Sequence, residues 1–90
     1  MVPVNNKADV RYYLENCLKG REGHSFELGF YETTLHVAHI RNRNHKPVYT
    51  LELGEMKAEY ADFGEMLSVA ENIYDIFEKV ALNIRYDLHD

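Results

Sequence analysis

Residues 25–60 read SFELGFYETTLHVAHIRNRNHKPVYTLELGEMKAEY and contain the strongest pattern in the chain. Apolar side chains recur at every second position through four short stretches, which candidate turns separate. This spacing predicts β-strands, because alternate side chains of a strand point to the same face. Folded as a meander of four antiparallel strands, the segment has one apolar face against which the rest of the chain can pack.

The register of this meander follows from pairing apolar residues across each connection. The first turn is expected at Glu32-Thr33 and the last at Gly54-Glu55, with a longer loop over residues 42–46 between them. The expected pairs are Phe30 with Leu35, Leu28 with Val37, Phe26 with His39, Arg41 with Pro47, Val37 with Leu51, Leu35 with Leu53, Leu53 with Met56, Leu51 with Ala58 and Tyr49 with Tyr60. On the other face, Glu52 falls between His36 and Lys57, an opposite-charge arrangement that stabilises a sheet.

Helices are predicted on both sides of the meander. Asn6 is a candidate N-terminal cap for a first helix that stops at Gly20, with Val10, Leu14, Cys17 and Leu18 as its apolar stripe. A second helix is expected from Asp62 to about Leu88, since no Pro or Gly interrupts the chain after Gly64. The sequence therefore predicts an α+β fold in which both helices cover one face of the sheet.

Length and composition limit the possible functions. Ninety residues with 46% hydrophobic content predict one domain, residues 1–90, with a packed core. No apolar run reaches membrane-spanning length and the start lacks a signal peptide, so a cytoplasmic location is expected. The single cysteine, Cys17, is predicted to be a buried thiol.

No catalytic or cofactor motif is present. The chain has no Gly-rich phosphate loop, nucleophile elbow or paired-cysteine motif, so we expect neither an enzyme nor a cofactor. His36 and His39 are three residues apart on one predicted strand, where they point to opposite faces and are unable to share a metal ion.

Charge is distributed unevenly along the chain. Residues 1–50 hold seven Lys/Arg against five Asp/Glu, or +2, whereas residues 51–90 hold three against ten, or −7. An acidic half repels nucleic acid and other polyanions and favours a partner protein with a basic or neutral surface. The proposed partner-binding residues are on the polar face of the second helix: Glu71, Asp75 and Glu78.

The loop over residues 41–46 is the basic exception. It places Arg41, Arg43, His45 and Lys46 beside two asparagines at the tip of a hairpin. These side chains are an alternative anion-binding site, at which phosphates of a nucleic acid are the expected ligand. Direct nucleic-acid binding is the second hypothesis, behind protein binding.

Two resemblances to known groups of proteins can be stated. In size and charge the chain resembles the short, acidic, Trp-free inhibitors and accessory proteins of phages and mobile elements, including anti-CRISPR proteins and DNA mimics. In its order of elements it resembles the double-stranded-RNA-binding domain. That family has a Lys-rich patch at the start of its second helix, where this chain has EYADFGE at residues 59–65, so the resemblance implies no functional residue here.

The second helix is also a candidate surface for self-association. Roughly 25 helical residues span nearly 40 Å, whereas a seven-residue strand spans about 23 Å, so the helix should extend past the sheet. Its apolar face is wider than one sheet needs. The excess is covered either by the first helix within the monomer or by a second copy of the chain. In the second case we expect an antiparallel homodimer in which Arg85 approaches Asp75 or Glu78 and the contact is formed by Ile76, Val80, Ile84 and Leu88.

Overall fold

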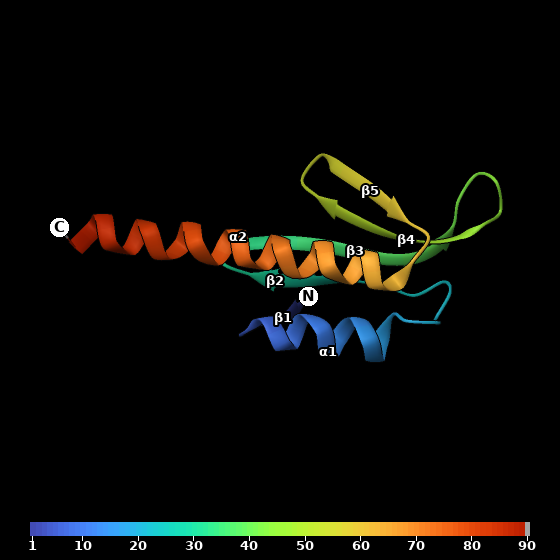
Figure 1. Ribbon diagram of the computed structural model, residues 1–90, viewed down its shortest axis with the longest axis horizontal. Helices are drawn as coiled ribbons and strands as arrows, with labels where there is room; N and C mark the ends of the chain where they lie inside the picture. Colours follow the sequence, from blue (N-terminus) through green and yellow to red (C-terminus); the bar gives the residue numbers. More distant parts are fainter. Residues whose placement is uncertain (90) are drawn as a thin grey trace.

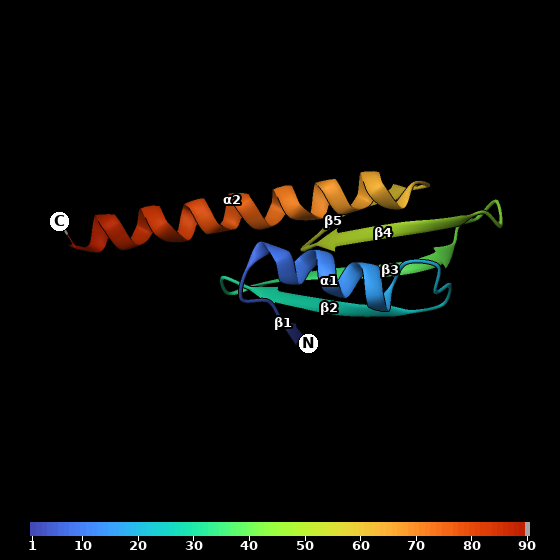
Figure 2. The ribbon, with the colours of Figure 1, turned by 60° about the horizontal axis from the view of Figure 1, so that its bottom comes forward.

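The computed structural model describes the backbone of residues 1–89 and the side chains of residues 1–83. Within residues 1–89, five strands form one sheet in the order β1-β2-β3-β4-β5, and both helices lie on the same face of it (Figures 1 and 2). The predicted α+β class is confirmed. In chain order the elements are β1 (Val2–Pro3), α1 (Lys7–Cys17), β2 (Ser25–Phe30), β3 (Thr33–Arg41), β4 (Pro47–Leu53), β5 (Met56–Tyr60) and α2 (Phe63–His89).

The predicted register is confirmed for two of the three hairpins. Val37 pairs with Leu51 across β3 and β4, and Leu51 pairs with Ala58 across β4 and β5. Glu52 lies between His36 and Lys57, as expected, and its carboxylate is 3.7 Å from the Lys57 ammonium.

The predicted register of β2 with β3 is wrong by two residues. Leu28 faces Leu35 rather than Val37, because the turn consists of Tyr31 and Glu32. Both turn residues have left-handed backbones, with φ of 46° and 59°. Two-residue hairpin turns require this conformation, since it matches the twist of the strands. A shift of two residues leaves every side chain on its predicted face.

A fifth strand, β1, was not predicted. It pairs parallel with β2, placing Val2 beside Leu28 and Pro3 beside Gly29. The backbone N–H of Val4 donates to the Gly29 carbonyl at 2.9 Å and extends this contact. Pro3 is tolerated because β1 is at the edge of the sheet, where one side of the strand needs no ladder hydrogen bonds.

Both helices begin at the predicted caps. The Asn6 side chain accepts a hydrogen bond from the Asp9 N–H at 2.9 Å, and Asp62 accepts one from the Glu65 N–H at the same distance. The Asn6 and Asp62 side chains thereby satisfy N–H groups that the first turn of a helix leaves without a partner. After α1, the chain turns at Gly20, whose φ is +70°.

The core is formed where α1 and α2 pack on the inner face of the sheet. Cys17 does not belong to it: its predicted burial is wrong, because the residue is exposed at the last position of α1. It lies roughly 60° around the helix from the centre of the buried residues. Fully buried members of the core include Val10, Leu14, Leu18, Leu28, Leu35, Val37, Met66, Ala70 and Tyr74.

Within the part of the chain that the structure describes, no helix is long and apolar enough to cross a membrane.

Candidate protein-binding surfaces

Beyond its buried side, α2 has two further sides of different character. One side meets α1 and is charged, while the other faces β5 and is apolar. At 100° per residue these two sides are roughly opposite one another around the helix. The three acidic residues predicted to bind a partner, Glu71, Asp75 and Glu78, all lie on the charged side.

The charged side is an ion-pair ladder between antiparallel helices. Lys7 contacts Asp75 at 3.2 Å, and Arg11, one turn further along α1, contacts Glu71 at 2.9 Å, one turn back along α2. Arg11 also lies 3.8 Å from Glu15 within α1. We call this surface the charged seam, comprising Lys7, Arg11, Glu15, Glu71, Asp75 and Glu78.

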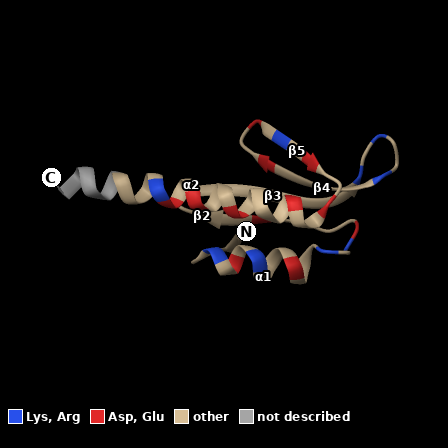
Figure 3. Ribbon diagram, viewed as in Figure 1, with Lys and Arg blue, Asp and Glu red and all other residues tan. Residues whose placement is uncertain are grey.

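These three acids are not freely solvated charges. The Glu71 side chain is only 19% exposed, and each of the three predicted residues has a polar contact within the fold. The seam nevertheless keeps four carboxylates against two cations, which leaves it with a net charge of −2. Figure 3 shows this acidic helical side at a distance from the basic hairpin tip.

Glu78 belongs to a hydrogen-bonded group at the point where α2 passes the turn between β2 and β3. It accepts a hydrogen bond from the Tyr31 hydroxyl at 3.2 Å, and that hydroxyl lies 3.3 Å from the hydroxyl of Tyr74. Burial raises the pKa of Tyr74 above its usual 10.0, and the hydrogen bond to Tyr31 and the nearby Glu78 carboxylate raise it further. Through its hydroxyl contacts to Tyr74 and Glu78, Tyr31 holds the turn between β2 and β3 against α2.

This shift predicts a loss of stability in alkaline solution. Above about pH 10 the unfolded chain releases the Tyr74 proton while the folded protein keeps it, so the free energy of unfolding falls as the pH rises. The fall is at most about 1.4 kcal/mol per pH unit for this group. In urea melts at a series of pH values, Tyr74→Phe should show a shallower alkaline decline than the wild type. Equal slopes would contradict this role of Tyr74.

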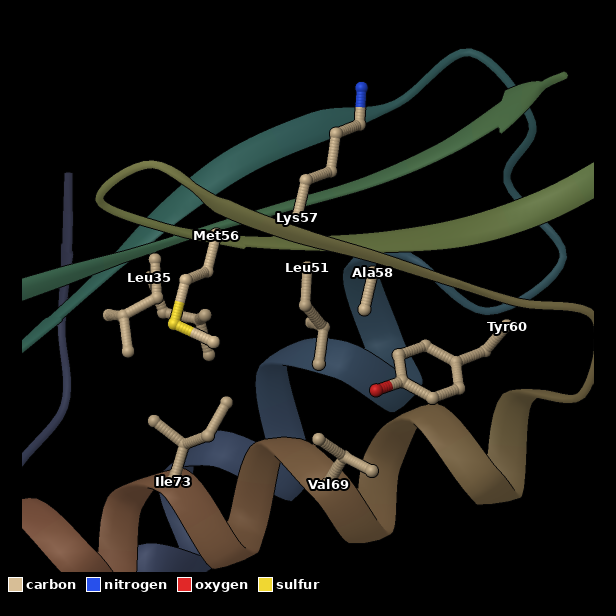
Figure 4. A pocket seen from close by; sticks show the side chains of 9 residues that line it. Leu35, Leu51, Met56, Lys57, Ala58, Tyr60, Val69 and Ile73 are labelled. Atoms are coloured by element: carbon tan, nitrogen blue, oxygen red, sulfur yellow. The ribbon is translucent and has the colours of Figure 1, made fainter.

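The apolar side of α2 borders a hollow between the helix and the hairpin of β4 and β5. The hollow has a volume of about 290 Å³ and is open to solvent. Figure 4 shows Val69 and Ile73 facing it from the helix and Met56 from β5. We call it the apolar hollow; its lining residues are Leu35, Leu51, Leu53, Met56, Lys57, Ala58, Tyr60, Val69 and Ile73.

The same side of α2 remains apolar beyond the hollow. Ile76 and Val80 follow Val69 and Ile73 at helical spacing, and they are 60% and 49% exposed. The C-terminal part of α2 projects past the sheet, as was predicted (Figures 1 and 2). Val69, Ile73, Ile76 and Val80 form what we call the apolar stripe. The side chains of Ile84, Arg85 and Leu88, also expected in this contact, lie outside the described residues.

The alternative anion-binding loop is partly occupied by its own hydrogen bonds. Arg41 donates to the His45 carbonyl at 2.7 Å and pairs with Glu22, while the Asn42 side chain accepts hydrogen bonds from two N–H groups of the loop. Arg41 and Asn42 therefore shape the turn. Arg43, His45 and Lys46 are exposed at its tip.

The two strand histidines have separate environments. His36 is on the outer face, 4.0 Å from Glu27, whereas His39 is buried on the inner face and stacks on Tyr49 with ring centroids 4.1 Å apart. Over residues 1–83, whose side chains are described, no three His, Cys, Asp or Glu side chains are placed to hold a metal ion.

Comparison of the chain with protein-family models, curated proteins and solved structures finds no match. Any functional assignment therefore depends on the surfaces described above.

Proposed function

We propose that this chain is a small, non-catalytic protein-binding module that presents its charged seam to a basic surface of another protein. The observation that carries the proposal is the gathering of four carboxylates against two cations along α1 and α2. Because both helices pack on a common core, this surface is held in a fixed arrangement. A partner then meets preorganised acceptors, which lowers the entropy cost of binding.

The internal ion pairs leave capacity for an external partner. An ionised carboxylate has about four acceptor positions, and the contacts to Lys7 and Arg11 each use only part of that capacity. Asp75 and Glu15 have side chains 43% and 45% exposed. Arg or Lys side chains of a partner can therefore add hydrogen bonds to the seam while the ladder to α1 is kept.

The proposed partner is a cytoplasmic protein whose basic surface normally holds nucleic acid, such as a nuclease. Acidic phage-encoded inhibitors and DNA mimics act on such targets, and the net charge of −5 supports this class. On this proposal, the chain competes with nucleic acid for the basic surface of its target.

Capture experiments with matched charge variants test the proposal. A seam variant carries Glu71→Gln, Asp75→Asn and Glu78→Gln. It should fail to capture the proteins that the wild type captures from host lysate. The control carries Glu32→Gln, Glu55→Gln and Glu59→Gln, which change the net charge equally at exposed positions outside the seam. Circular dichroism should show both variants folded, since partly exposed ion pairs contribute about 0.2–1 kcal/mol each.

The three capture profiles separate the possible outcomes. Selective loss from the seam variant supports the proposal, whereas equal capture by all three proteins overturns it. Binding of duplex DNA or RNA that weakens with salt and with Arg43→Gln would instead assign function to the basic loop.

A further inference from the structure

The apolar hollow and the apolar stripe have no role in the proposed contact, because they lie on the side of α2 opposite the charged seam. They form one continuous surface, in which the hollow adjoins Val69 and Ile73 and the stripe continues to Ile76 and Val80. Contiguous exposed apolar surface of this kind marks an interaction site. The question is what covers it.

A second copy of the chain fits this surface in length. Ile73 borders the hollow, and Val80 follows it by seven residues, or two helical turns, about 10 Å along the axis. A two-fold axis beside Ile76 and Phe77 would place Val80 of each copy next to Ile73 of the other. The projecting part of one helix would then lie along the hollow of the other copy, and the exchange is reciprocal, as a two-fold contact requires.

The charges on this side of α2 also favour a second copy. Within a quarter turn of the stripe, from residue 66 to residue 83, the polar side chains are Asn72, Lys79 and Asn83. No carboxylate is among them, so residues 66–83 of two acidic molecules can meet here without bringing acids together. Antiparallel helices place Lys79 near Asn72 of the other copy, on the same side of the contact.

We propose that two copies of this chain associate through antiparallel α2 helices, with Val80 of each copy packed against the apolar hollow of the other. The charged seams then face away from the contact and remain available, so this inference does not depend on the proposed function. The monomer already has a closed core of its own. Association is therefore a concentration-dependent equilibrium between folded monomers and dimers.

Light scattering and sedimentation on the purified protein test the association. The wild type should approach twice its monomer mass of 10.6 kDa as its concentration rises from micromolar towards millimolar. Val80→Asp should remain a folded monomer throughout. The control is Leu82→Asp. Leu82 is also an exposed apolar residue, at 43%, but it lies 200° around the helix from Val80, so this variant should still dimerise.

Disulfide trapping tests the orientation of the helices. In a Cys17→Ser background, mixing Ile73→Cys with Val80→Cys protein should give mainly the mixed disulfide between the two variants. Preferential linkage of each variant to itself would indicate parallel helices and overturn the arrangement. The proposal is also overturned if the wild type keeps its monomer mass at every concentration, if Val80→Asp still dimerises, or if both Asp variants are folded monomers.

Discussion

Tyr74→Ala is expected to lower the free energy of unfolding by about 3–5 kcal/mol, the usual cost of truncating a buried aromatic side chain. Tyr74 is 2% exposed, and the centroid of its ring lies 5.2 Å from that of Phe30 and 5.5 Å from that of Tyr31. The change removes this aromatic group and the hydroxyl contact with Tyr31 together. Urea denaturation followed by circular dichroism measures the loss.

Tyr12 offers a matched control on the other helix. It is 60% exposed, so Tyr12→Ala should change the free energy of unfolding by no more than about 0.5 kcal/mol. Similar losses for Tyr12→Ala and Tyr74→Ala would show that α2 is not anchored to the sheet through the aromatic group around Tyr74.

Leu28→Ala is expected to cost about 2–5 kcal/mol, because Leu28 is fully buried at the centre of the core. Met56→Ala, at a position 75% exposed, should cost much less.

A double-mutant cycle tests the register of β2 with β3, since Leu28 faces Leu35 and not Val37. The coupling energy should be larger between Leu28 and Leu35 than between Leu28 and Val37. A larger coupling energy between Leu28 and Val37 would instead support the register expected from the sequence.

The alternation of apolar residues was sufficient to predict the faces of β2 to β5, but it did not determine every register. Gly54 marks the turn between β4 and β5, where its φ is +61°, and that hairpin was predicted correctly. Tyr31 and Glu32 adopt left-handed conformations without the Asn or Gly that usually indicates them. Because registers two residues apart have identical faces, hydrophobic pattern alone is unable to choose between them.

The sequence predicted the acidic residues that α2 contributes to the charged seam but not the residues of α1. The helical spacing of Glu71, Asp75 and Glu78 placed them correctly on one polar side of α2. Lys7 and Arg11, the partners of Asp75 and Glu71, are 68 and 60 residues away in the chain and are brought there by the packing of α1 on α2. The apolar hollow was also missed, because it depends on how far the hairpin of β4 and β5 stands from the helix. The width of the apolar face of α2 was the only signal of it.

Strand β1 was missed because two residues, one of them proline, show no periodicity. Burial on the outer face of the sheet does not follow from the apolar pattern either. Thr50 is polar and lies on that face, yet it is only 2% exposed. Neighbouring strands shield a small residue in the middle of a sheet even where no helix covers it.

The sequential order of the strands has a consequence for folding kinetics. Neighbouring strands from β2 to β5 are joined by loops of two, five and two residues, so each hairpin closes at small entropic cost. Among the strands of the described sheet, only β1 pairs with a distant segment, since Val2 must reach Leu28. Pairing between strands that are neighbours in the chain favours rapid folding. We expect the four-stranded meander to form early and β1 to join its edge last, after the intervening helix has docked.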